Sequence, residues 1–123
     1  EGIPEFIYEF FPVLKEMKSR KAGNLSGGQQ QQLAIARALA SKPSVLILDE
    51  PTEGIQPSII KEIAQSLNRL RKELGIAVLV SEQVLSFAME VADEIVVLDL
   101  GRIVRIANKN LVDINEVRSY LTV

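Results

Sequence analysis

The sequence predicts a layered α/β protein in which short apolar strands alternate with amphipathic helices. Three apolar runs, at residues 45–48, 77–80 and 94–98, have the length and composition of buried strands. Stretches with helical periodicity separate these runs, and glycine or proline marks the junctions. Strands that alternate with helices of this length favour a mostly parallel sheet with flanking helices.

The first third of the chain is expected to be helical. Residues 4–17 place apolar and aromatic side chains at helical spacing, and Pro12 marks a break. A polar connector over residues 18–24 leads to a second helix, residues 29–40, which is rich in good helix formers and lacks Gly and Pro. Pro43 prevents this helix from continuing.

The rest of the chain is expected to alternate between strands and helices. The continuous apolar run at residues 45–48 fits a parallel strand covered on both faces better than a half-exposed one. Gly54 and Pro57 mark a turn before a long helix at 58–74, which ends at Gly75. A strand at 77–80 and a short helix at 85–91 are expected after it. A strand at 94–98 should then pair with a strand at 103–107 as an antiparallel hairpin, with the turn at Gly101. A last helix is expected at 115–121.

Composition sets limits on the class of protein. The 123 residues, 47% hydrophobic and 24% charged, suit one domain without an internal repeat or linker. The net charge of -2 and the scattered basic residues argue against nucleic acid as the main partner. Cysteine is absent, which excludes a disulfide framework. No apolar stretch reaches the length of a membrane span, and no signal peptide is visible.

A glycine pair precedes the second helix. Ser26 is the expected N-cap, followed by Gly27, Gly28 and Gln29. A helix start with unpaired amides, two residues without side chains and a hydroxyl forms a small, positively polarised pocket that suits phosphate oxygens. The alternative is an ordinary capped helix after a glycine turn.

Two acids follow the first apolar run. Asp49 and Glu50 are adjacent, and burying both would be costly without a cation or a proton. In a phosphoryl-transfer enzyme, one such acid helps to hold Mg²⁺ and the other orients or deprotonates the attacking water. The alternative is a strand that ends in a solvated acidic turn. The glycine pair upstream favours the functional interpretation.

Three segments resemble ABC-type ATPases. Residues 25–39 (LSGGQQQQLAIARAL) resemble the signature sequence, and residues 48–57 (LDEPTEGIQP) resemble the Walker B strand and the turn after it. With residues 81–83 (SEQ), they look like the ATP-binding subunits of branched-chain amino-acid and urea importers. Residues 52–60 (TEGIQPSII) and the ending YLTV lean towards the urea type. The likeness matches only the second half of such a subunit.

The resemblance implies a partial P-loop NTPase fold, with residues 1–40 in the signature-helix part and residues 41–123 in the core part. It implies ATP and Mg²⁺ as ligands, with Asp49 on the metal and Glu50 acting on the water. Ser26, Gly27, Gly28 and Gln29 would contact the ATP of a second ATP-binding subunit. Gln83 stands where many relatives place a γ-phosphate-sensing His; it can donate a hydrogen bond but cannot titrate near neutral pH. The alternative for Gln83 is a polar residue at a helix start.

Walker A is missing from these residues, since no G-x-x-x-x-G-K-[ST] sequence occurs. We therefore expect little or no ATPase activity from this chain alone. In the family, the Walker A strand lies between the strands expected near residues 77–80 and 94–98. Without it, those strands must pair with each other, leave edges open or borrow a strand, and open apolar edges favour self-association.

The resemblance also implies partners and a location. The parent subunit would work as a dimer with transmembrane permease subunits, in the cytoplasm at the inner face of the cell membrane. Two other functions stay open. One is a non-catalytic interaction module that uses the helix and the apolar faces for assembly. The other is part of a soluble ABC ATPase, which is disfavoured because neither a second cassette nor coiled-coil heptads are visible.

Overall fold

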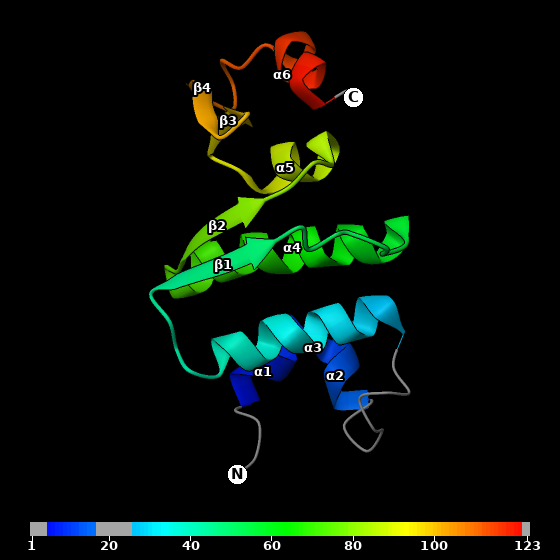
Figure 1. Ribbon diagram of the computed structural model, residues 1–123. Coiled ribbons are helices and arrows are strands. Elements are labelled where there is room, and N and C mark those ends of the chain that lie inside the picture. The colour runs from blue at the N-terminus through cyan, green and yellow to red at the C-terminus, as the bar shows by residue number, and fades with distance from the viewer. Residues whose placement is uncertain (1–4, 17–25, 122–123) are drawn as a thin grey trace. The chain divides into compact units, whose positions relative to one another are not determined.

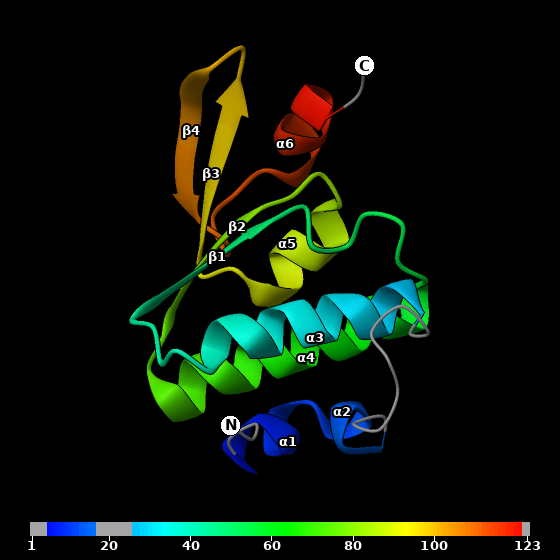
Figure 2. The same ribbon diagram turned by 60° about the horizontal axis from the view of Figure 1, so that its bottom comes forward.

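The computed structural model describes residues 5–16 and 26–121 (Figures 1 and 2). The chain forms two compact units, one that ends at Ser81 and one that begins at Glu82. The sequence gives no sign of this division, since neither a linker nor a shift in composition marks it. The predicted subdivision at residue 40 falls inside the first unit and stays a prediction. Among the described helices, none is long and apolar enough to span a bilayer.

The described residues of the first unit form four helices and a two-stranded parallel sheet. The strands β1 (Val45–Asp49) and β2 (Ala77–Ser81) pair from Val45 opposite Ala77 to Asp49 opposite Ser81. Parallel strands require a crossover connection, and the long helix between them supplies it. The helices are α1 (Glu5–Phe10), α2 (Pro12–Glu16), α3 (Gly27–Leu39) and α4 (Pro57–Leu74), in agreement with the expected elements.

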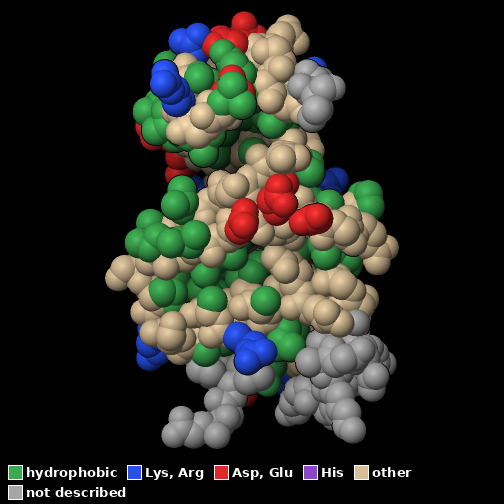
Figure 3. Space-filling view, in the orientation of Figure 1, with side chains coloured by type: hydrophobic (Ala, Val, Ile, Leu, Met, Phe, Trp, Pro, Cys, Tyr) green, Lys and Arg blue, Asp and Glu red, His purple; other side chains and the backbone are tan. Residues whose placement is uncertain are grey.

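Only one face of this sheet is covered within the first unit. Leu46 and Leu48 are buried, whereas Ile47 is 70% exposed and Leu79 is 62% exposed. The prediction that β1 is covered on both faces is therefore wrong for this structure, although its parallel pairing is confirmed. In Figure 3, hydrophobic side chains gather over these strands, next to acidic side chains. We call the uncovered side chains the apolar sheet face, which comprises Val45, Ile47, Ala77 and Leu79.

The first helix, α1, packs on α4. Ile7 and Phe11 are almost completely buried. The Arg69 guanidinium lies 4.8 Å from the centre of the Phe10 ring and donates a hydrogen bond of 2.9 Å to the Glu9 carbonyl. The Ser66 hydroxyl donates to the Phe10 carbonyl at 3.0 Å. These contacts attach the C-terminal end of α1 to α4. The buried side chains of α3 and α4 that complete the core are Ile35, Leu39, Ile63, Leu67 and Leu70.

The second unit is a hairpin with two helices. Its elements are α5 (Leu85–Val91), β3 (Glu94–Asp99), β4 (Arg102–Asn108) and α6 (Ile114–Leu121). The predicted antiparallel pairing is confirmed, with an irregularity between Val97 and Leu98. Ile95, Val97 and Val117 form the buried cluster.

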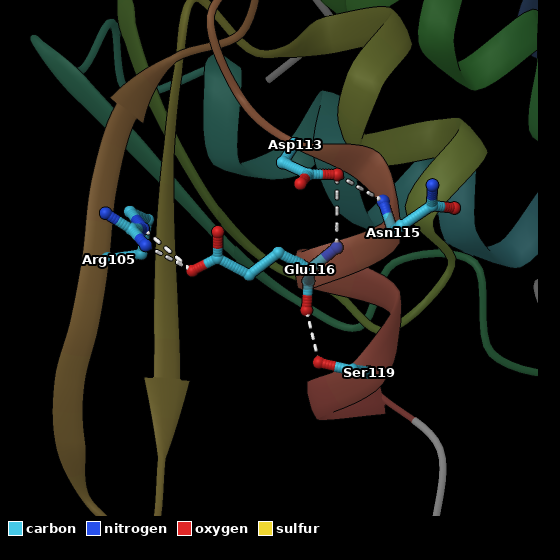
Figure 4. Close-up of polar contacts among 5 residues, drawn as sticks. All are labelled: Arg105, Asp113, Asn115, Glu116 and Ser119. Atoms are coloured by element: carbon cyan, nitrogen blue, oxygen red, sulfur yellow. Dashed lines mark hydrogen bonds and ion pairs between the residues drawn. The ribbon is translucent and has the colours of Figure 1, made fainter.

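Polar contacts hold α6 against β4 (Figure 4). The Asp113 carboxylate accepts hydrogen bonds from the amides of Asn115 at 3.0 Å and Glu116 at 3.3 Å, which caps the helix start. Arg105 Nε donates to the Glu116 carboxylate at 2.9 Å. This hydrogen bond raises the pKa of Arg105 above its ordinary value. The pair links the hairpin to the last helix.

The two sheets are separate among the described residues, because β2 pairs with β1 and β3 pairs with β4. The predicted strands near residues 77–80 and 94–98 thus do not pair with each other. Of the three outcomes predicted for an absent middle strand, the first does not occur among the described residues, and the other two stay predictions.

Two neighbouring substitutions in β1 test which side of the strand is packed. We expect Leu46→Ala to lower the free energy of unfolding by about 2–5 kcal/mol, because the buried side chain leaves a cavity. Ile47→Ala, on the exposed side, should lower it by less than about 1 kcal/mol. Urea unfolding of dilute protein measures both. Equal losses would contradict the one-sided packing.

Candidate functional site

The glycine-rich helix start, residues 26–29, begins α3 as predicted. The Ser26 hydroxyl accepts a hydrogen bond from the Gln29 amide at 3.2 Å, and the Gln29 side chain accepts one from the Ser26 amide at 3.0 Å. This reciprocal pair is a capping box and confirms Ser26 as the N-cap. Within residues 5–16 and 26–121, the amides of Gly27 and Gly28 have no hydrogen-bond acceptor. They are the donors left for an anion at the positive end of the helix.

The two glycines are in different environments. Gly27 is exposed, and a Cβ added there would meet Ile55 Cδ1 at an ordinary 3.7 Å. Gly28 is buried, and a Cβ there would lie 2.4 Å from Ile59 Cγ2. Gly27 thus leaves the helix start open to a ligand, and Gly28 is required by packing. The sequence alone does not indicate the contact between Ile59 and Gly28.

The acidic turn, residues 49–56, follows β1 and leads into α4. The Glu50 amide donates to the Ser81 carbonyl at 2.7 Å, so the turn starts beside the end of β2. The Glu53 amide donates to the Glu50 carbonyl at 3.2 Å, and the Ile55 amide donates to the Thr52 carbonyl at 3.1 Å. Thr52 and Pro51 are buried, which anchors the turn.

Glu50 has a φ of 46°, in the left-handed region that favours glycine. A side chain with a Cβ is strained in this conformation, and such strain concentrates at functional sites. The sequence offered no signal for it. The backbone geometry therefore agrees with the predicted functional role of Glu50, which stays a prediction.

Neither acid is fully buried. Asp49 is exposed and Glu50 is half-buried. The cost of burying two adjacent carboxylates without a cation or a proton therefore does not arise in this unit. No group of three or more His, Cys, Asp or Glu able to hold a metal occurs among the described residues. Mg²⁺ commonly uses one or two carboxylates together with substrate phosphates and waters, and Asp49 fits that pattern.

The acidic turn and the glycine-rich helix start are neighbours. The same added Cβ at Gly27 would lie 3.9 Å from the Gly54 carbonyl oxygen, and Ile55 is within van der Waals reach of Gly27. Two motifs separated in sequence thus form one packed region of the first unit.

Gln83 lies in the second unit and is exposed. Its amide donates to the Glu82 carboxylate at 2.9 Å, and the Val84 amide donates to the same oxygen at 3.1 Å. These bonds order the segment before α5 and are compatible with the polar helix-start alternative. The role of Gln83 at the γ-phosphate stays a prediction.

A cavity of about 320 Å³ lies elsewhere in the first unit, near the ends of α3 and α4. Its lining is mostly apolar, with one cation, and contains none of the predicted site residues. The lining residues are Phe6, Leu39, Lys42, Pro43, Leu74 and Ile76.

Comparison with known proteins identifies the region just described. The family model for ABC transporters matches residues 8–53, which include the glycine-rich helix start, Asp49 and Glu50. The chain is similar to ATP-binding proteins of transport systems. The high-affinity branched-chain amino acid transport ATP-binding protein BraG of Pseudomonas aeruginosa is 49% identical to it over 98 residues, which make up 80% of this chain and 42% of BraG. The L-cystine transport system ATP-binding protein TcyN of Escherichia coli is 46% identical over 80 residues, 65% of this chain and 32% of TcyN.

Solved ABC cassettes share the fold. A nucleotide-free ATP-binding cassette from an ABC transporter has a TM-score of 0.77 at 30% identity and covers 94% of this chain, which spans 43% of that cassette. A dimeric structure of a post-hydrolysis state of the cassette MJ0796, bound to ADP and Pi, has a TM-score of 0.65 at 36% identity, covering 72% of this chain and 38% of its own. The chain thus spans less than half the length of these relatives. The predicted partial P-loop NTPase fold is confirmed.

Two substitutions at Glu50 test the backbone strain. Glu50→Ala and Glu50→Gly both remove the carboxylate and differ only in the Cβ. We expect the Gly variant to have a free energy of unfolding about 1 kcal/mol higher than the Ala variant, because glycine tolerates the positive φ. Thermal or urea unfolding compares them. An Ala variant at least as stable as the Gly variant would contradict a strained Glu50.

Proposed function

We propose that these residues are the C-terminal portion of an ATP-binding subunit that hydrolyses ATP to drive an ABC importer. The observation that supports this most strongly is the packing of a helix start against the acidic turn that contains Asp49 and Glu50. Among the described residues, the amides of Gly27 and Gly28 at this helix start have no acceptor. Both groups that a triphosphate requires, anion donors and carboxylates, thus belong to one compact unit.

The residues would divide the work. The amides of Gly27 and Gly28 donate to phosphate oxygens of an ATP held by a second subunit, while the capping box of Ser26 and Gln29 keeps the helix start ordered. Asp49 helps to hold Mg²⁺, which when bound neutralises charge on the phosphates. Glu50 orients or deprotonates the attacking water, and Gln83 donates to the γ-phosphate.

The solute is proposed to be a branched-chain amino acid or urea. The 49% identity to BraG supports the amino acid, and the TEGIQPSII segment supports urea. Relatives named for L-cystine and methionine also match, so the ATP-binding domain alone does not distinguish solutes.

The proposed partners are a second ATP-binding subunit and transmembrane permease subunits. The dimeric cassette MJ0796 supports the first, and the transport functions named for the curated relatives support the second. A subunit with such partners would act in the cytoplasm at the inner face of the membrane. A non-catalytic interaction module is the second candidate, and the exposed apolar sheet face favours it.

A chimera tests the catalytic proposal. The segment of BraG that matches this chain is replaced by the chain's own residues, so that BraG supplies the rest of the subunit. We expect Mg²⁺-dependent ATP hydrolysis by the purified chimera. Glu50→Gln should lower kcat by about 10²–10⁴-fold, because it removes the proposed base, while ATP binding is retained.

Glu53→Gln is the matched control, since Glu53 is an exposed acid of the same turn. It should leave kcat within about twofold. Equal kcat values for the two variants would exclude Glu50 as the base. A folded chimera without ATPase activity, assayed beside active BraG, would favour the interaction module.

The uncovered strands also generate a prediction about the chain by itself. We expect it to self-associate, because the apolar sheet face and the strand edges are open. Ile47→Lys should lower the associated fraction, whereas Gln65→Lys, which adds the same charge at an exposed site of α4, should not. Light scattering at high concentration measures both. A monomeric wild-type chain would contradict self-association, and equal behaviour of the variants would place the contact elsewhere.

A further inference from the structure

At Gly28, the backbone of α3 packs directly against the side chain of Ile59 on α4. A Cβ added at Gly28 would lie 2.4 Å from Ile59 Cγ2, 3.0 Å from Ile59 Cβ and 3.1 Å from Ile59 Cγ1. Because Ile is branched at Cβ, its side chain is stiff and cannot easily swing aside. The position of the helix start is therefore set by one side chain of the neighbouring helix.

A second contact fixes the register of the two helices. Gln32 Nε2 donates to Glu62 Oε2 at 3.3 Å, and Gln32 is only 4% exposed. Gln32 lies one turn after Gly28 on α3, and Glu62 lies about one turn after Ile59 on α4. The two contacts are thus stacked along both helices, and α3 cannot slide along α4 without breaking one of them.

Ile59 is also tied to the acidic turn. Gln56, the last residue of that turn, is the N-cap of α4, and its carbonyl accepts the Ile59 amide at 3.0 Å and the Ile60 amide at 3.1 Å. Ile55, one residue earlier, lies against Gly27. The turn therefore leads directly into the side chains that contact both glycines.

We propose that Ile59 is a positioning residue that couples the acidic turn to the glycine-rich helix start, so that the two move as one body. The consequence for nucleotide rests on the proposed function. In the proposed function, the acidic turn acts on the ATP of its own subunit, while the start of α3 contacts the ATP of the second subunit. A displacement of the acidic turn would therefore shift the Gly27 and Gly28 amides at the second ATP. Ile59 would link the two sites through a single chain.

A double-mutant cycle on the full chain tests the coupling. We expect Gly28→Ala to raise the unfolding equilibrium constant by about 10- to 100-fold, because the added methyl group overpacks the contact. In an Ile59→Ala background, which removes both Cγ atoms and keeps only the Cβ at 3.0 Å, the same change should have an effect at least about threefold smaller. Gly27→Ala, the matched control with ordinary contacts, should change it by less than about threefold in either background. Equal effects of Gly28→Ala in both backgrounds would overturn the proposal.

Amide NMR spectra give a readout that holds even if Gly28→Ala does not fold. Ile59→Ala should shift the Gly27 and Gly28 amide resonances, and Ile60→Ala, at the neighbouring half-buried Ile, should shift them much less. Equal shifts would overturn the positioning role.

Titration with inorganic phosphate separates this inference from the proposed function. The wild-type chain should show saturable shifts at the same two amides, and Ile59→Ala should weaken them. If the double-mutant cycle gives the expected coupling but phosphate does not shift the wild-type amides, only the proposed anion contact is contradicted. A response that Ile59→Ala leaves unchanged would overturn the positioning role alone.

Discussion

The close approach of α3 to α4 at Gly28 is the constraint on which the candidate site depends. Only a residue without a side chain leaves room for Ile59 at this point. This packing places the start of α3 beside the turn that contains Asp49 and Glu50. The first glycine of the pair stays open to ligand while the second is committed to packing. One short sequence motif thus serves packing and, in the proposed function, anion recognition as well.

A second constraint comes from the half-covered parallel sheet. Parallel strands are normally buried on both faces, yet Ile47 and Leu79 are exposed in this unit. The relatives are longer, since this chain spans 42% of BraG and 43% of the nucleotide-free cassette. An uncovered face costs apolar burial and favours association. The strand composition therefore suits a larger assembly than the residues present.

Local structure was the most predictable part. The breaks at Pro12 and Pro43, the cap at Ser26 and the left-handed residue Gly75 all follow from short-range chemistry, and the structure confirms them. Long-range features were not predictable from one sequence. The continuous run at residues 45–48 correctly indicated a parallel strand, but a pattern cannot show whether a covering layer is present. The positive φ of Glu50 and the Ile59 contact depend on the three-dimensional path of the turn, which leaves no periodic signal.

The most direct test is a crystal structure of the Glu50→Gln chimera with Mg-ATP. The account predicts a dimer in which the Gly27 amide of one molecule donates to the γ-phosphate of a nucleotide held by the other. It also predicts that Asp49 lies beside the metal of its own nucleotide. Phosphates distant from the start of α3, or a metal held without Asp49, would contradict the account.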